Sequence, residues 1–140
     1  MPRRVIEVDF KDPMQDYFNI LVIEDDDADA ALIKKQVEAL WPKSMVLPVK
    51  SLQDAYKTFK NEQINLFLLD LNLPDAMGPK TVAAVRKFNK KVPIVVITGM
   101  GTDLTVREAL KLGANHVVLK SSIMDPDFKQ ILKEALDLDE

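Results

Sequence analysis

The segment Leu66-Phe-Leu-Leu-Asp70 is a continuous apolar run that ends in an acid, and it decides the fold. Three further apolar runs end in acidic, hydroxyl or basic residues: Ile20-Leu-Val-Ile-Glu-Asp25, Ile94-Val-Val-Ile-Thr98 and Val117-Val-Leu-Lys120. Because their apolar residues follow one another without alternation, each run predicts a strand buried on both faces. A weaker run at residues 45–49 contains Pro48, which favours an edge strand.

Helical patterns occupy the connections between these runs. Apolar residues recur there at helical spacing, and Ser51, Pro79 and Thr102 supply signals for helix starts. A strand–helix unit repeated five times predicts a parallel sheet with helices on both faces. A short strand at residues 5–10 is expected outside this pattern. The predicted helices cover residues 28–41, 52–61, 79–88, 102–113 and 128–136.

Composition limits the class of protein. The chain has 140 residues, 47% of them apolar and 29% charged, which fits one globular domain. It has no cysteine, which excludes a disulfide framework, a thiolate metal site and a cysteine nucleophile. No apolar run reaches the roughly 20 residues of a membrane helix. The net charge of -3 argues against nucleic acid as the main partner. The negative charge is local, because 19 basic residues face only 17 acidic residues once the five acids among residues 24–29 are left out.

Polar residues follow the predicted strands at the points where they end. These residues are Glu24, Asp25, Asp70, Thr98 and Lys120. In an open α/β sheet, ligands bind at the carboxyl ends of the strands, so we expect these side chains to converge. Clustered carboxylates raise one another's pKa values or require a cation, and hard oxygen ligands favour Mg²⁺, with Mn²⁺ and Ca²⁺ left open. A lysine and a threonine beside a nucleophilic carboxylate are typical of a receptor for a phosphoryl group.

The four strand-end stretches of this sequence resemble the receiver domain of response regulators in two-component signalling. The likeness covers residues 19–140 and leaves residues 1–18 as an N-terminal extension. It implies a doubly wound, flavodoxin-like (βα)5 fold of three layers, with a five-stranded parallel sheet in the order 2-1-3-4-5. The matching stretches are Ile20-Leu-Val-Ile-Glu-Asp25, Leu68-Leu-Asp-Leu-Asn-Leu-Pro-Asp75, Pro93-Ile-Val-Val-Ile-Thr-Gly99 and Gly113-Ala-Asn-His-Val-Val-Leu-Lys120.

The resemblance also implies a function and a site. Asp70 would accept a phosphoryl group from a sensor histidine kinase or phosphotransfer protein, and Thr98 and Lys120 would bind the phosphoryl oxygens. The domain would act in the cytoplasm by docking to an unidentified downstream protein, without nucleic acid or membrane, and a homodimer is left open. The Mg²⁺ ligands would be Glu24, Asp25, Asp70 and the backbone carbonyl of Asn72.

Two departures from the family pattern favour an alternative. Ser121 stands where the family usually has a proline after a cis peptide bond, and Val117 replaces the aromatic residue of its switch. A pseudo-receiver that binds partners without phosphoryl turnover is therefore the second hypothesis. A phosphatase of the haloacid-dehalogenase type ranks third, because it needs an aspartate where this chain has Asn72. In the family, positions 72 and 100 tune dephosphorylation.

The acidic segment at residues 24–29 also has a structural explanation. Acids favour the first turn of a helix, so we expect Asp26, Asp27 and Asp29 to cap the next helix and face solvent. Glu24 and Asp25 would then face the site. A register one residue later would make Asp26 the ligand instead. The single histidine, His116, is expected in a surface loop.

Overall fold

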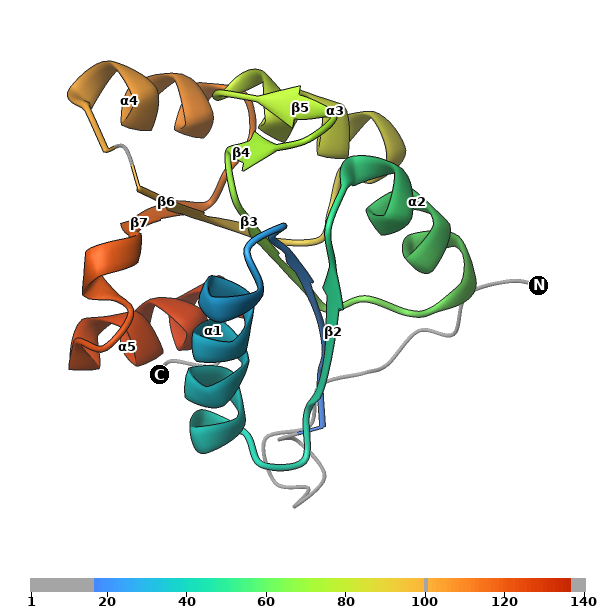
Figure 1. Cartoon of the computed structure of the whole chain (residues 1–140), viewed down its shortest axis with the longest axis vertical. Coiled ribbons are helices and arrows are strands. Elements are labelled where there is room, and N and C mark those ends of the chain that lie inside the picture. The colour runs from blue at the N-terminus through green and yellow to red at the C-terminus, as the bar shows by residue number, and fades with distance from the viewer. Residues whose placement is uncertain (1–16, 100, 137–140) are drawn as a thin grey trace.

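The computed structural model describes residues 17–99 and 101–136, so the strand expected at residues 5–10 and the side chain of Met100 lie outside the described part. A five-stranded parallel sheet forms the centre of the domain, in the order β2-β1-β3-β6-β7 (Figure 1). This confirms the predicted strand order 2-1-3-4-5. The strands are β1 Asn19–Ile23, β2 Met45–Val49, β3 Leu66–Leu69, β6 Ile94–Thr98 and β7 His116–Leu119.

Helices cover both faces of this sheet and complete three layers (Figure 1). Two of them, α1 and α5, pack on one face, and the other three pack on the opposite face. All five lie within a few residues of the predicted segments. Their bounds are α1 Asp27–Leu40, α2 Leu52–Asn61, α3 Lys80–Phe88, α4 Asp103–Lys111 and α5 Pro126–Ala135.

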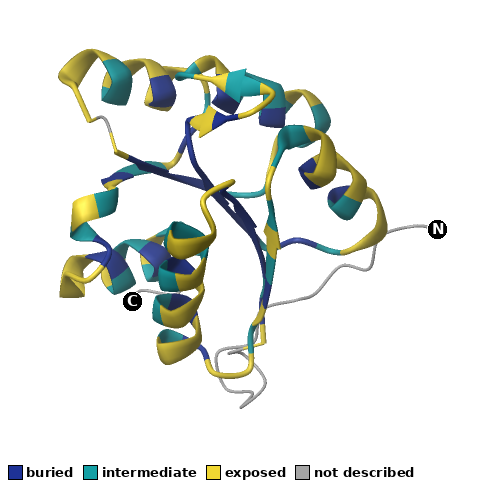
Figure 2. Cartoon of the chain, viewed as in Figure 1, coloured by how far each residue is buried: buried dark blue, intermediate teal, exposed yellow. Residues whose placement is uncertain are grey.

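The central strands explain why their sequences are apolar without interruption. In β1, Ile20 and Val22 face the layer of α1 and α5, whereas Leu21 and Ile23 face the layer of α2 and α3. All four side chains are fully buried. Figure 2 shows the central strands mostly in dark blue, the colour of buried residues. Strand β2 lies at one edge, as Pro48 predicts, because a proline has no N–H to donate to a further strand.

The prediction for the last strand is partly wrong. Val118 is buried, but Leu119 is 41% exposed and Val117 is half-buried, so β7 is not covered on both faces. The reason is its position at the other edge of the sheet, beside β6 only. His116 is the first residue of β7 and is half-buried, which corrects its expected place in a surface loop.

Short polar side chains cap the helices that begin near the carboxyl edge of the sheet. The Asp26 carboxylate accepts a hydrogen bond from the backbone N–H of Asp29, 2.9 Å away, and so caps α1. Ser51 does the same for α2 through the N–H of Asp54, at 3.1 Å. Both caps agree with the sequence prediction. They start α1 and α2 immediately after β1 and β2, with their first turns at this edge.

Arg86 of α3 joins three segments on the opposite side of the domain. Its guanidinium donates to the carbonyl of Gly113 at 2.8 and 3.2 Å and to that of Val92 at 2.7 Å. Gly113 has φ +122, a conformation that favours glycine, and this turn aims its carbonyl at Arg86. Burial lowers the pKa of Arg86. The planar fork of donors thus connects α3 to the segments before β6 and β7.

Arg86→Ala is expected to lower the free energy of unfolding by about 2–4 kcal/mol, because two part-buried carbonyls lose their donors. Arg86→Lys should recover only part of this loss, since an ammonium cannot reproduce the fork. Urea unfolding followed by circular dichroism measures both. The exposed neighbour Lys87 provides the control, and a Lys87→Ala loss as large as that of Arg86→Ala would contradict the assignment.

Candidate functional site

The backbone of the sheet positions two buried acids at its carboxyl edge. Glu24 directly follows β1, and its N–H donates to the carbonyl of Val49 at 2.9 Å. Asp70 directly follows β3, and its N–H donates to the carbonyl of Ile23 at 2.9 Å. These bonds continue the ladder past the strand ends, and the two residues are only 2% and 4% exposed. Two carboxylates are therefore fixed side by side in a largely dry environment.

A third acid completes a group of carboxylates. One oxygen each of Glu24, Asp25 and Asp70 lies within 4.8 Å of the others, and Asp25 is the exposed member. Asp26 does not belong to the group, because its carboxylate caps α1. Like charges at this separation repel one another, and oxygen ligands in this number suit a hard divalent cation.

Lys120 supplies a positive charge to the same site. It begins the 3-10 turn Lys120–Ser122 after β7, and its Nζ lies 2.9 Å from Glu24 Oε1 and 3.6 Å from Asp70 Oδ2. Nζ is also 2.8 Å from Asp29 Oδ2, in the first turn of α1. The expectation that Asp29 only caps the helix and faces solvent is therefore wrong. The first turn of α1 brings this carboxylate over the edge of the sheet.

Burial and neighbouring charges change the acidity of two of these groups. The pKa of Glu24 is raised to about 7, chiefly by burial and also by the Asp70 carboxyl, which together outweigh the lowering by Lys120 and the N–H of Asp26. Burial lowers the pKa of Lys120, but Asp29, Glu24 and Asp70 outweigh this effect, so that the pKa lies above its ordinary value. Lys120 is therefore a permanent cation at neutral pH, whereas Glu24 readily takes up a proton in the metal-free protein.

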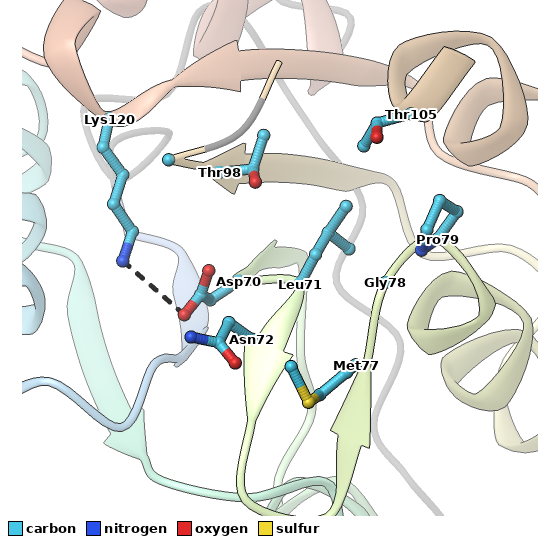
Figure 3. A pocket seen from close by; sticks show the side chains of 10 residues that line it. Asp70, Leu71, Asn72, Met77, Gly78, Pro79, Thr98, Thr105 and Lys120 are labelled. Carbon is cyan, nitrogen blue, oxygen red and sulfur yellow. Dashed lines mark ion pairs between the residues drawn. The ribbon is translucent and has the colours of Figure 1, made fainter. Parts of the chain in front are cut away.

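A pocket of about 480 Å³ opens beside Asp70. Figure 3 shows the side chains of Asp70, Thr98 and Lys120 converging on it from the ends of three strands. Thr98 is the last residue of β6 and is 4% exposed. The structure thus brings Asp70, Thr98 and Lys120, which the sequence places at the ends of three strands, into one cavity. Its lining consists of Asp70, Leu71, Asn72, Met77, Gly78, Pro79, Thr98, Gly99, Thr105 and Lys120.

A small hairpin that the sequence did not predict forms one wall of this pocket. Its strands are β4 Asn72–Leu73 and β5 Ala76–Met77, and they pair antiparallel. Asp75 at the turn accepts hydrogen bonds from the N–H groups of Leu52 and Gln53, at 3.0 and 3.1 Å. The hairpin that carries Asn72 is therefore anchored to the N-terminus of α2. Only the Leu-Pro-Asp turn residues signalled this arrangement in the sequence.

Two positions where the sequence departs from the receiver pattern are also visible. The peptide bond between Lys120 and Ser121 is trans, since the described residues contain no cis bond. Val117 is the second residue of β7 and is half-buried. The place of the aromatic switch residue is thus taken by a small aliphatic side chain beside β6.

The chain forms an open α/β domain with a group of carboxylates and a pocket at the carboxyl edge of its sheet. The sequence profile of the response regulator receiver domain matches residues 20–133. The chain therefore belongs to the receiver domains of two-component signalling, a family whose members generally work with histidine kinases.

No helix among the described residues is long and apolar enough to cross a membrane.

Individual relatives agree with this assignment. The methanogenesis regulatory protein FilR1 of Methanothrix harundinacea is 30% identical over 122 residues, which are 85% of this chain and 27% of FilR1, so the chain spans about a quarter of that relative. The chemotaxis protein CheY1 of Helicobacter pylori is 29% identical over 85% of this chain and 94% of its own length. The receiver domain of a DNA-binding response regulator from Colwellia psychrerythraea has the same fold, with a TM-score of 0.76 at 22% identity over 86% of this chain and 98% of its own.

Proposed function

We propose that this domain is a phosphorylation-activated switch that accepts a phosphoryl group on Asp70 and signals by docking to another protein. The donor is a phosphohistidine on a sensor histidine kinase or phosphotransfer protein. One observation carries the proposal: a 4%-exposed aspartate lies beside two further carboxylates and lines a pocket together with a lysine and a buried threonine. That combination can hold a divalent cation and a phosphoryl group together.

The chemistry requires little of the protein beyond positioning. A carboxylate oxygen of Asp70 forms a bond to phosphorus while the bond from phosphorus to the imidazole nitrogen breaks, and the imidazole leaves. The Lys120 ammonium and the Thr98 hydroxyl donate to the phosphoryl oxygens. Hydrolysis turns the switch off: a water oxygen attacks phosphorus, the bond between phosphorus and Asp70 breaks, and inorganic phosphate departs.

The donor set at the site fits Mg²⁺. Glu24, Asp25 and Asp70 offer carboxylate oxygens within 4.8 Å of one another, and the backbone carbonyl of Asn72 in the adjacent hairpin is proposed as a further ligand. Hard oxygen ligands of this kind suit Mg²⁺, which keeps several waters. When bound, the ion neutralises charge on the carboxylates and the phosphoryl group.

We propose domain limits and a cellular setting for this receiver. The receiver covers residues 19–140, and the family profile at residues 20–133 supports this boundary. Residues 1–18 are proposed as an N-terminal extension, of which Phe18 packs in the core beside Trp41. The domain works in the cytoplasm with protein partners and not with nucleic acid or membrane. The histidine kinases that serve this family and the net charge of -3 support this setting.

Labelling with a small phosphodonor tests the proposal. The protein is expected to gain one phosphoryl group from acetyl phosphate in the presence of Mg²⁺ and none in EDTA, as measured by intact-protein mass spectrometry. Beryllofluoride, which mimics a phosphoryl group, should bind under the same conditions. If the protein neither becomes labelled nor binds beryllofluoride, the phosphoryl-transfer function is wrong.

Matched variants distinguish the loss of a metal ligand from the loss of a negative charge elsewhere on the surface. Asp25→Asn removes one member of the carboxylate group and is expected to weaken Mg²⁺ binding by about tenfold or more, the effect of losing a charged ligand interaction. Asp27→Asn removes an equal charge two residues later, where the carboxylate pairs with exposed Lys50 at 3.0 Å. Titration calorimetry with Mg²⁺ measures both, and equal effects would contradict the proposed ligand set.

The pseudo-receiver remains the second candidate because of Val117 and Ser121. It predicts a partner complex that beryllofluoride and Asp70→Asn leave unchanged. A phosphatase of the haloacid-dehalogenase type has less support, because the acid follows the third strand along the chain and Asn72 stands two residues later. Turnover of p-nitrophenyl phosphate would revive that third hypothesis.

A further inference from the structure

Carboxylates surround the ammonium of Lys120. An ammonium has three N–H donors. Three carboxylates lie around Lys120 Nζ, those of Asp29 at 2.8 Å, Glu24 at 2.9 Å and Asp70 at 3.6 Å. The contact with Asp70 is the longest and exceeds the length of a hydrogen bond. The lysine is thus held closer to Asp29 and Glu24 than to the proposed phosphoacceptor.

Asp29 differs from the other two carboxylates. Glu24 and Asp70 belong to the group that fits a divalent cation, whereas Asp29 does not. Its side chain is 37% exposed, and that of Glu24 is 1% exposed. The backbone N–H of Asp29 is already bonded to Asp26, so the cap of α1 does not need the Asp29 carboxylate. The contact with Lys120 joins residues 91 positions apart and is not part of the helix cap.

We propose that Asp29 is a positioning residue that holds Lys120 in the unphosphorylated protein and competes with the phosphoryl group for it. This inference rests on the proposed function of Asp70. To bind a phosphoryl oxygen on Asp70, the Lys120 ammonium must move toward Asp70 and away from the carboxylates that now hold it more closely. Asp29 is the carboxylate that water can solvate after release, and it is the one that a cation at the acidic group leaves unneutralised. Asp29 therefore sets how strongly the site favours the phosphorylated form.

The chain contains a matched control for this role. Asp27 lies in the same first turn of α1, carries the same charge and is exposed, but it pairs with Lys50 rather than Lys120. Asp27→Asn and Asp29→Asn change the net charge equally and remove similar helix-terminus interactions. Any difference between the two variants in the binding of a phosphoryl analogue therefore reports the contact with Lys120.

Beryllofluoride titrations in saturating Mg²⁺ test the proposal. Asp29→Asn is expected to tighten beryllofluoride binding about tenfold, the effect of removing one charged hydrogen bond from the competition, whereas Asp27→Asn should change it about twofold or less. If the wild type binds and the two variants change affinity equally, the role of Asp29 is refuted while the proposed function stands. If neither the wild type nor Asp29→Asn binds, the proposed function fails.

A second measurement does not depend on the phosphoryl analogue. In the metal-free protein, unfolding of the variants Asp29→Asn, Lys120→Met and the double variant gives the coupling between the two residues. We expect clear non-additivity for Asp29 with Lys120 and additivity for Asp27 with Lys120. The nuclear magnetic resonance signal of the Lys120 Nζ group should also shift in Asp29→Asn and stay constant in Asp27→Asn. Additive stabilities and an unchanged Nζ signal would overturn the inference.

Discussion

Asp70→Asn is expected to reduce labelling by acetyl phosphate to background, the largest effect of any single change in this domain. The side-chain amide has the shape of the carboxylate but no anionic oxygen that can attack phosphorus. Because the variant also removes one of three clustered negative charges, we expect it to fold and to be at least as stable as the wild type without metal. Intact-protein mass spectrometry measures labelling, and thermal unfolding confirms that the variant is folded.

The control for this prediction is an exposed aspartate in a neighbouring helix. Asp54→Asn in α2 removes the same charge outside the carboxylate group and should leave labelling within twofold of wild type, an effect of the size expected for a surface charge. Mapping the modified peptide adds a direct check. Labelling that persists in Asp70→Asn, or that maps to Asp25, would place the acceptor elsewhere in the acidic group.

The central strands and the location of the site were predictable because local sequence determines both. A strand with helices on both faces must be apolar at every position, and residues 20–23, 66–69 and 94–97 show this directly. Parallel strands end at one edge, so the polar residues after them had to meet there. The carboxylates of Glu24, Asp25 and Asp70 do lie together at this edge.

The features that the sequence did not reveal depend on contacts between distant segments. Whether the run at residues 117–119 is central or at an edge depends on strand order, which the run itself does not encode. The contact of Asp29 with Lys120 joins α1 to the end of β7, and an acid in a first helical turn usually caps the helix or faces solvent. The hairpin of β4 and β5 is held by Asp75 on α2, again across the fold.

Lys120→Met is expected to destabilise the metal-free protein by about 3 kcal/mol at a pH well above 7, where Glu24 is ionised, because it leaves a buried carboxylate without its cation. The Glu24 side chain is 1% exposed and that of Lys120 is 24% exposed, so water cannot replace the ammonium at Glu24. Lys50→Met provides the control, since Lys50 pairs with Asp27 at side-chain exposures of 63% and 83%. That pair should contribute less than about 1 kcal/mol. Urea unfolding in EDTA compares the two variants.

Mg²⁺ should reverse much of the loss in Lys120→Met, and this response distinguishes a charge effect from a packing effect. A divalent cation at the acidic group supplies the positive charge that the variant lacks and binds only the folded protein, so it stabilises by about 2.7 kcal/mol at a hundred times its Kd. A cavity or a steric clash at position 120 would not respond to Mg²⁺ beyond the response of the wild type. Beryllofluoride binding should remain weak in Lys120→Met even with Mg²⁺, because the donor to the phosphoryl oxygens is absent. A variant as stable as Lys50→Met in EDTA, or one that binds beryllofluoride like the wild type, would show that Lys120 neither neutralises Glu24 nor holds the phosphoryl group.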